Sequence, residues 1–511
     1  MRHTIGKSRD QIEMYSLEDM VETDSPVRQI DKVIDEIDTS YFAKAQTKQT
    51  GRRPFNPKDM LKLYTYGMDN GVHSSRKLER ECKRNVEVMW LMNGLQPDDK
   101  TICNFRRENA ENITRFFKEY CRKLFQDGYI DGKIVAIDGT KIRANNSKRN
   151  NFSASKIDRH IEYIDNKIAE YLQEIENNDK IAELEERKAK YQTFKQSIKD
   201  GKVSEVSTTD PDSRLMKQGN NGVDVSYNVQ AAVDSKNKLI TGMGVTNEPN
   251  DQGQLYKEAK VVKDNLGLSK MTVLADKGYY KTDDFKDCHV DGITTVVAAP
   301  EERESKDGII LTKTDFKYDN EKDCYYCPVG KVLSFSSEDA KGFRRYECRK
   351  GCKSCERKND CTKGIRRVIT RHKYSGYAEQ NDKTFQENYE LYKKRQLLSE
   401  HPFGTVKRTM GIRQFLTRGL INVTAETALI LFAYNLKRLR NICKNDNKKD
   451  GGNSQFVHPF ASFIVFCFLF RGQNILGRNA PVDTEFIAFL RSLTGAFVEI
   501  CLTKATMHVK L

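Results

Sequence analysis

Residues 132–144 read GKIVAIDGTKIRA, a short β-branched run that ends on Asp138 and Gly139. Such a run predicts a strand that leaves the core with a carboxylate at its exit. Residues 271–280 read MTVLADKGYY and predict another strand that ends on an acid, Asp276. On neighbouring strands of one mixed α/β sheet the two carboxylates would lie side by side.

The segments around these two strands continue the α/β pattern. Residues 225–233 and 239–245 have the residue pattern of strands and flank the turn Asp234-Ser235-Lys236-Asn237, so they predict a hairpin. Residues 253–267 predict a helix, and the run ITTVVAAP at 293–300 predicts a fifth strand. The order of strand, hairpin, helix, strand, helix and strand is typical of one mixed sheet.

An insert interrupts this sheet between the first strand and the hairpin. From Ile157 the apolar residues recur at steps of four and three, and after Asn177-Asn178 a second series runs from Ile181 to Ile198. This periodicity predicts an antiparallel helical hairpin within residues 152–200. No residue pattern in this hairpin suggests a catalytic or metal-binding site, so we expect it to contribute to the shape of the protein or to contact a partner.

The first 130 residues predict a helical region with basic faces. One helix follows Pro57, a second spans residues 74–94 with Ser74 or Ser75 as its cap, and a third unit covers residues 101–128. Short helices with basic faces suit a DNA-binding region. The alternative is a helical cap or a dimerisation module, because basic amphipathic helices are common on solvated surfaces.

The charge balance favours a polyanionic partner. The chain has 511 residues, with 87 Lys and Arg against 72 Asp and Glu, a net charge of +15. Nucleic acid is the first candidate, and an anionic membrane surface the second. The N-terminus lacks the apolar region of a secretory signal, and the longest apolar run, Phe460–Phe470, is well short of the ~20 residues that span a bilayer. We therefore expect a cytoplasmic protein without a membrane span.

A third acid, Glu400, follows the fifth strand in a segment that predicts a helix. Hard Mg²⁺ or Mn²⁺ ions bind oxygen ligands, and two such ions about 4 Å apart support phosphoryl transfer. The three carboxylates of Asp138, Asp276 and Glu400 would supply the oxygen ligands of such ions. Either strand-end Asp alone could instead be an ordinary turn residue.

Several segments carry a family resemblance. IDGTKIRA around Asp138, LADKGYY around Asp276 and SEHPFGTVKR around Glu400 resemble bacterial insertion-sequence transposases of the DDE class, as do GRRPFNPKDMLKLYTYG and DDKTICNFR near the N-terminus. The resemblance covers roughly residues 40–440 in the family's order. It implies an RNase H-like catalytic domain with Asp138, Asp276 and Glu400 as the metal-binding triad. It also implies cleavage of DNA at the element ends, followed by strand transfer.

The neighbours of Glu400 fit the family signature only in part. Related transposases carry Tyr-x2-Arg-x3-Glu-x6-Lys, and Tyr392, Arg395 and Lys407 match in type, but four residues separate Arg395 from Glu400. On a continuous helix Lys407 would share the face of Glu400, while Arg395 would be rotated away. Lys407 is therefore the predicted phosphate contact, although Pro402 weakens the continuity of the helix.

A cysteine cluster lies between the fifth strand and Glu400. It contains Cys324-x2-Cys327 and then Cys348-x3-Cys352-x2-Cys355-x5-Cys361, a spacing typical of zinc ribbons. We predict that Cys324, Cys327, Cys352 and Cys355 bind Zn²⁺, with Cys348 and Cys361 as rivals for the second pair. The alternative is that the thiols are reduced and buried without metal.

The same region is strongly basic. Residues 341–373 hold 13 Lys and Arg against three acids, a net charge of +10. Such a segment would contact phosphates electrostatically. The predicted DNA-binding residues are Lys407, Arg344, Arg345, Arg366 and Arg367.

Together these features predict a DNA transposase that acts by two-metal-ion chemistry on DNA as a homodimer or larger assembly, in the cytoplasm near the bacterial nucleoid. The alternatives are a metal-dependent nuclease and a transposase-derived DNA-binding protein without catalysis. The expected regions are a helical one (1–130), the first part of the catalytic domain (131–300), a Cys-rich insert (301–385), a helical part with Glu400 (386–445), and a linker with an unassigned tail (446–511).

Overall fold

The computed structural model describes residues 10, 12, 14–45, 53–172, 178–201, 205–218, 222–301, 311–349 and 351–449. Residues 1–445 form one compact unit. The apolar run Phe460–Phe470 lies outside the described residues. Within the described ranges, no helix combines the length and the apolar character that crossing a membrane requires.

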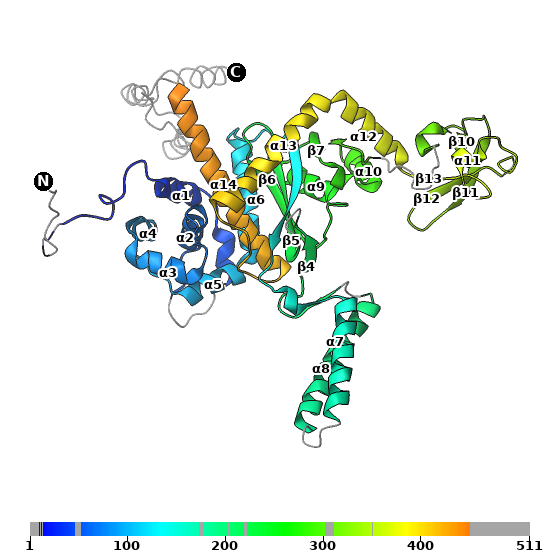
Figure 1. Cartoon of the computed structure of the whole chain (residues 1–511). Helices are drawn as coiled ribbons and strands as arrows, with labels where there is room; N and C mark the ends of the chain where they lie inside the picture. The colour runs from blue at the N-terminus through cyan, green and yellow to red at the C-terminus, as the bar shows by residue number, and fades with distance from the viewer. Residues whose placement is uncertain are drawn as a thin grey trace, which may run out of the picture. The chain divides into compact units, whose positions relative to one another are not determined.

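The N-terminal region is helical, as the sequence predicts (Figure 1). Ser74 caps its helix by accepting a hydrogen bond from the Lys77 N–H, which confirms the predicted start. The single helix expected over 74–94 is wrong, because Asn85 adopts an extended conformation and its side chain caps a new helix. The helices are α1 (Pro26–Asp35), α2 (Pro57–Asp69), α3 (Ser75–Arg84), α4 (Val86–Leu91), α5 (Asp99–Glu108) and α6 (Ala110–Gln126), with a 3₁₀ turn η1 (Ser40–Ala45).

The central sheet has six strands. Its long strand β5 pairs antiparallel with β1 along one side, and with β4 and then β6 along the other. β7 pairs parallel with β1, and β8 pairs parallel with β7. The strands are β1 (Ile134–Arg143), β4 (Arg214–Lys217), β5 (Val223–Asp234), β6 (Ile240–Thr246), β7 (Met271–Ala275) and β8 (Ile293–Val297). The predicted hairpin and fifth strand are thus confirmed.

Helices cover both faces of this sheet. On one face Val135 and Ile137 join a core with α9 (Leu255–Leu266), and on the other Ala136 packs with Leu398 of α13 (Tyr389–Gly404). Alternation along β1 explains this division, since successive side chains of a strand point to opposite faces. The helix α10 (Thr282–Val290) lies between β7 and β8 in the chain.

The helix α14 (Leu420–Lys449) joins the N-terminal helices to the sheet. Its Phe432 ring packs on Phe116 and Tyr120 of α6, with centroids 4.9 and 4.6 Å apart. Its Asn435 amide donates to the Ile240 carbonyl and accepts from the Ile240 N–H, both at 2.8 Å. The N-terminal helices therefore share one hydrophobic core with the sheet.

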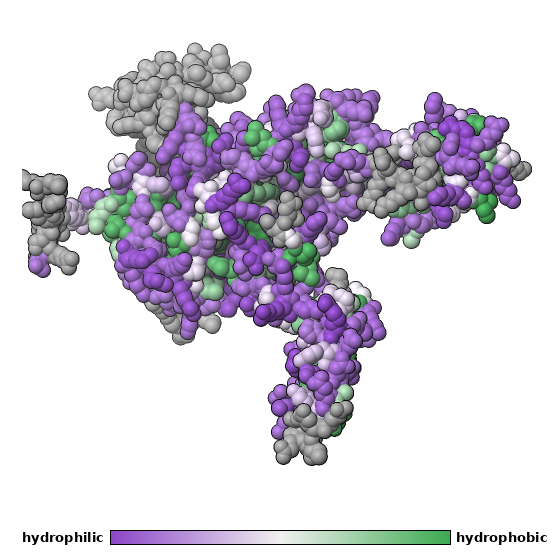
Figure 2. All heavy atoms as spheres, viewed as in Figure 1, coloured by the Kyte–Doolittle hydropathy of each residue, from purple (hydrophilic) through white to green (hydrophobic). Residues whose placement is uncertain are grey.

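The insert between β1 and β4 is a helical hairpin, as predicted. Figure 1 shows α7 (Ala154–Tyr171) and α8 (Asn178–Lys199) side by side, and ion pairs such as Lys188–Asp165 at 2.5 Å link them. A short ladder of β2 (Asn151–Phe152) and β3 (Val206–Ser207) joins its base. Its surface in view is largely hydrophilic (Figure 2).

The Cys-rich insert forms a second, five-stranded sheet in the order β13-β12-β11-β10-β9. Where the insert leaves and rejoins the main sheet, Asn381 of α12 accepts from the Val297 N–H at 3.1 Å and donates to the Val297 carbonyl at 2.9 Å. The elements are β9 (Lys317–Asp319), β10 (Cys324–Tyr326), β11 (Val332–Glu338), β12 (Phe343–Glu347), β13 (Val368–His372), the short helix α11 (Lys358–Cys361) and α12 (Ser375–Glu387).

Glu258 of α9 is a buried acid that forms no ion pair within the described residues, although the charges of Lys257 and Lys118 act on it from a distance. One of its carboxylate oxygens has no hydrogen-bond partner among the described residues, and burial raises the pKa of Glu258 from 4.5 to about 7. Between these pH values the folded protein holds a proton that the unfolded chain has lost. The free energy of unfolding should therefore fall as the pH rises through this window, by about 3 kcal/mol in total.

We predict that Glu258→Gln removes this dependence, because the amide keeps the shape without the charge. In urea unfolding, the variant should be about 3 kcal/mol more stable than the wild type at pH 8 and similar to it at pH 4.5. Glu170→Gln, at an exposed position of α7, is the control and should change neither value. An equal difference at both pH values would contradict the prediction.

Candidate active site

Asp138 and Asp276 lie beside each other where the parallel strands β1 and β7 pair. Asp276 directly follows β7, as predicted, but the predicted strand end at Asp138 is wrong, because β1 continues past it to Arg143 and pairs with β5 along this stretch. β1 pairs with β7 so that Ile134 faces Thr272 and Ala136 faces Leu274, and the same offset carried two residues further brings Asp138 level with Asp276. The Gly139 N–H donates to Asp138 and the Gly278 N–H donates to Asp276, each at 2.8 Å. The predicted juxtaposition of the two acids is thus confirmed.

The surroundings of Asp138 make its negative charge costly. Burial raises the pKa of Asp138, and the neighbouring Asp276 charge raises it further. The Ser399 hydroxyl, the Gly139 N–H and the Arg395 charge act in the opposite direction. A cation bound between Asp138 and Asp276 would therefore stabilise the ionised form of Asp138.

One face of α13 supplies those opposing groups. Tyr392, Arg395 and Ser399 recur at steps of three and four, which places them on the same side of a helix. The Ser399 hydroxyl is buried near Asp138 but forms no hydrogen bond of ordinary geometry, and the buried Arg395 Nε has no hydrogen-bond partner among the described residues. This face of α13 therefore presents two buried groups near Asp138, the Ser399 hydroxyl and the Arg395 Nε–H, that lack a hydrogen-bond partner among the described residues.

Lys407 reaches the same site from beyond the helix. Its Nζ donates to the Thr140 hydroxyl at 2.6 Å, two residues along β1 from Asp138. Burial and the nearby Lys141 lower the pKa of Lys407. The sequence predicts Lys407 on the face of Glu400, but α13 runs through Pro402 into a π-helical segment, η6 (Thr405–Thr409), whose wider turn rotates each residue less.

Glu400 is not brought together with the two aspartates. Its side chain is exposed and accepts a hydrogen bond from Gln396 Nε2 at 2.9 Å. Ser399, one residue earlier, occupies the helix position nearest Asp138. The spacing Tyr392-x2-Arg395-x3-Ser399 was the signal that sequence reasoning could have used, since it places Ser399 where the family signature has its acid.

A polar network lies on the opposite face of β1. Asp251 accepts from Asn228 at 2.7 Å and from Gln230 at 2.8 Å, and it pairs with Lys141 at 3.3 Å. Gln230 in turn accepts a hydrogen bond from the buried Tyr279 hydroxyl, in the turn η4 (Lys277–Tyr279) that follows Asp276. The network therefore connects β5 to the turn that holds Asp276, and the sequence analysis did not identify it.

A glycine makes this arrangement possible. A Cβ at Gly139 would lie 2.6 Å from both Asp251 Oδ1 and Gln230 Nε2. Any side chain at this position would displace the network immediately beside Asp138. Gly139, in the middle of β1, thus allows close packing beside Asp138.

The two aspartates fit a hard divalent cation only as a partial ligand set. Within the ranges that the structure describes, no three His, Cys, Asp or Glu side chains converge as metal ligands. Asp138 and Asp276 nevertheless supply two half-buried carboxylates whose mutual repulsion a cation would relieve.

Comparisons with known proteins find two transposase families. Residues 15–108 match a family described as a transposase domain (DUF772), and residues 326–440 match a family described as a transposase DDE domain. Both matches are consistent with a DDE transposase of the insertion-sequence type. The DDE-domain match includes Glu400, Lys407 and most of the Cys-rich insert, whereas Asp138 and Asp276 lie outside both matched ranges.

Other comparisons add little to the transposase match. No curated protein matches the chain. The cryo-EM structure of a piggyBac transposase synaptic complex with hairpin DNA matches at 10% identity over 90% of this chain and 85% of that chain. Its TM-score is 0.26, a level of likeness that carries no argument about fold.

The structure separates one predicted zinc ligand, Cys324, from the others. Cys327, Cys352 and Cys355 line one small cavity, together with Cys348 and Cys361. Cys324 is buried and lines a different hollow, beside Tyr326 and Phe335 among others. The predicted set of Cys324, Cys327, Cys352 and Cys355 is therefore not assembled around one cavity.

The predicted DNA-binding arginines of the insert differ in how they are engaged. Arg344 pairs with Glu338 at 2.9 Å and Arg366 pairs with Glu347 at 3.1 Å. Arg367 donates to the Cys361 carbonyl at 2.7 Å. Arg345 is exposed on β12. Arg366 is exposed as well, so Arg345 differs from it in having no ion pair among the described residues.

Proposed function

We propose that the chain is a DNA transposase that cleaves the ends of an insertion sequence and joins them to target DNA by two-metal-ion phosphoryl transfer. The transposase-domain matches support this reading. The observation that carries it is the placement of Asp138, in the middle of β1, level with Asp276, which directly follows the adjacent parallel strand β7. The strand order β6-β5-β1-β7-β8, antiparallel in its first three members and parallel in the rest, is the order expected of an RNase H-like sheet.

In this proposal Asp138 and Asp276 hold Mg²⁺ or Mn²⁺, and Glu400 completes the set from α13. When bound, these ions would activate the attacking oxygen and stabilise the leaving oxygen. The two carboxylates are pre-aligned by β-sheet pairing, so the protein supplies the spacing before any ligand arrives. Glu400 would have to turn toward the aspartates from its exposed position on α13.

Arg395 and Lys407 would hold the phosphate beside the acids. The Arg395 Nε is buried without a hydrogen-bond partner among the described residues, so a phosphate oxygen would satisfy it. The Lys407 ammonium is partly desolvated beside Thr140, where contact with an anion recovers the lost solvation. These residues orient the phosphodiester and offset its charge.

The direct test uses DNA from the two borders of the gene's own element. Purified protein is incubated with labelled border duplexes and a target plasmid in Mg²⁺, Mn²⁺ or EDTA. We expect strand cleavage at the borders and joined product, both dependent on the divalent cation. Binding of border DNA without cleavage in either metal would overturn the proposal, and cleavage without joined product would favour a nuclease.

A second candidate function is DNA binding without catalysis. It is favoured by one observation, the exposed position of Glu400 with Ser399 nearest Asp138. The two readings differ in the same assay, because a binding protein would shift border DNA on a gel and leave it uncut.

We predict that DNA binding depends on the exposed cation Arg345. Arg345→Ala should lower the slope of log affinity against log salt by about 0.9, the contribution of one phosphate contact, and weaken binding to all sequences alike. Arg344→Ala and Arg366→Ala should change the slope less, because an acid already pairs with each side chain. Fluorescence anisotropy across a salt series measures this.

The control for this prediction is Lys190→Ala, which removes an exposed cation from α8 of the helical hairpin. Its slope should equal that of the wild type. An unchanged slope in Arg345→Ala would mean that DNA does not contact this residue. An unchanged slope after combined replacement of Arg344, Arg345, Arg366 and Arg367 would mean that DNA binds elsewhere than on the Cys-rich insert.

A further inference from the structure

The Cys-rich insert has a very small hydrophobic core of its own. Its described residues form a cluster separate from the main core, and the fully buried members are few: Leu311, Phe316, Tyr325, Leu333, Tyr346, Cys348 and Ile369. A region of this size usually needs disulfides or a metal in addition to such a core. None of the described cysteines is in a disulfide.

The alternation of side chains along a strand determines which cysteines lie on the same face of the small sheet. Tyr325 of β10 points into the insert core, so Cys327, two residues on, falls on the same side, while Cys324 falls on the other. In the same way Cys348 follows the buried Tyr346 of β12. The insert core and the cysteine cavity therefore lie on one face of the small sheet.

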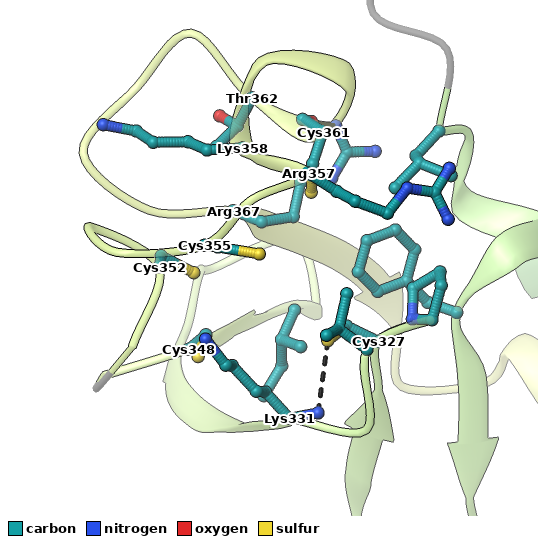
Figure 3. Close-up of a pocket in the computed structure, with 15 residues that line it drawn as sticks. Cys327, Lys331, Cys348, Cys352, Cys355, Arg357, Lys358, Cys361, Thr362 and Arg367 are labelled. Atoms are coloured by element: carbon teal, nitrogen blue, oxygen red, sulfur yellow. Dashed lines mark hydrogen bonds between the residues drawn. The ribbon is translucent and has the colours of Figure 1, made fainter.

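Five cysteines surround one cavity on that face. Figure 3 shows the side chains of Cys327, Cys348, Cys352, Cys355 and Cys361 arranged around it. Four of these thiols come from three segments of the chain: Cys327 follows β10, Cys352 and Cys355 lie in the loop before α11, and Cys361 ends α11.

The turn at Cys327 has the form expected around a metal-bound thiolate. The Gly330 N–H donates to the Cys327 carbonyl at 2.8 Å, with Gly330 at a φ of +77° that favours glycine. The next N–H, of Lys331, donates to the Cys327 sulfur at 3.2 Å (Figure 3). Such N–H donation stabilises negative charge on sulfur and orients the ligand.

The rim of the cavity carries the complementary charge. Four thiolates with one Zn²⁺ leave a net charge of −2. Lys331, Arg357, Lys358 and Arg367 line the same cavity and offset that charge. Arg367 is itself fixed by donating to the Cys361 carbonyl.

We propose that Cys327, Cys352, Cys355 and Cys361 bind one structural Zn²⁺ in the Cys-rich insert. Cys348 remains a thiol of the insert core, where it is 4% exposed, and Cys324 lies on the other face. The sulfurs line the cavity without converging as metal ligands in the described residues, so binding draws the segment that carries Cys352 and Cys355 inward. Four soft thiolates favour a closed tetrahedral Zn²⁺ site over Mg²⁺ or Ca²⁺.

The test compares six single variants of the full chain, each Cys→Ala at positions 324, 327, 348, 352, 355 and 361. Zinc is measured by elemental analysis after expression with added zinc and exhaustive dialysis. We expect about one zinc per chain in the wild type, C324A and C348A, and at least a tenfold lower content in C327A, C352A, C355A and C361A. Circular dichroism and the main thermal transition should stay close to wild type, since the main sheet has its own core.

Cobalt substitution gives a readout that does not depend on insert stability. Wild type, C324A and C348A should bind Co²⁺ with the intense visible absorption of a tetrahedral thiolate site, and the other four variants should not. A wild-type chain that binds neither metal and has all its thiols freely reactive would overturn the site. Retention of metal by C361A with its loss in C324A would overturn the ligand set.

Discussion

Asp138→Asn and Asp276→Asn should each abolish DNA strand cleavage while binding of border DNA stays near that of the wild type. The two carboxylates lie level on adjacent strands, and the site as folded already penalises the charge on Asp138. An amide at either position removes one anionic metal ligand and leaves the shape almost unchanged. A loss of about 4 kcal/mol of transition-state stabilisation, or roughly a thousandfold in rate, is the minimum expected.

The double variant distinguishes a shared role from two separate ones. If both acids hold the same ions, Asp138→Asn combined with Asp276→Asn should be no worse than either alone. Asp264→Asn, at an exposed position of α9, is the matched control and should cleave at the wild-type rate. If either single variant cleaves DNA with Mg²⁺ at near the wild-type rate, Asp138 and Asp276 do not act together as the metal ligands of catalysis.

Glu400→Gln should also abolish cleavage, while Glu390→Gln should not. Both glutamates are exposed on α13, and each contacts its own helix, Glu390 through Lys393 and Glu400 through Gln396. The pair is therefore matched in helix, exposure and local bonding, and differs in distance from Ser399. The expected loss for Glu400→Gln is again about a thousandfold.

Other outcomes of the Glu400→Gln and Glu390→Gln comparison would each point to a different ligand. Cleavage by Glu400→Gln with loss in Glu390→Gln would mean that the acid of α13 has been assigned to the wrong residue. If neither variant loses cleavage, the third ligand lies elsewhere. Ser399→Glu, which places an acid at the spacing of the family signature, then tests whether the position nearest Asp138 can supply it.

The central sheet could be predicted from the sequence because its signals are local. The β-branched run before Asp138 and the run before Asp276 each form a buried strand, and both faces of β1 are covered, which fixes the register. The hairpin turn at 234–237 is likewise marked by its own residues. Each of these features depends on neighbours within a few positions.

The details of α13 could not be predicted, because they depend on tertiary contacts. Pro402 lacks an N–H and disfavours a helix before it, yet the helix continues through this buried residue. The π-helical turn that follows brings Lys407 to Thr140, 267 positions earlier in the chain. Periodicity assumes a uniform rotation per residue, so it assigned Lys407 to the wrong face.

The cysteine ligands could not be chosen from spacing alone for a related reason. Cys324-x2-Cys327 looks like a ligand pair, but a strand occupies 324–326 and sends the two side chains to opposite faces. A turn in place of that strand would have kept them together. The choice between Cys324 and Cys361 therefore depends on secondary structure that the spacing does not encode.

The pairing of Asn381 with Val297 has a consequence for how this chain could change over time. Both hydrogen bonds of that pair hold the entry and exit of the Cys-rich insert against each other. Once the ends are tied, doubling the length of the enclosed segment costs only about 0.6 kcal/mol of closure entropy. A longer or shorter segment between Val297 and Asn381 should therefore change the stability of the main sheet little and leave its two aspartates in place.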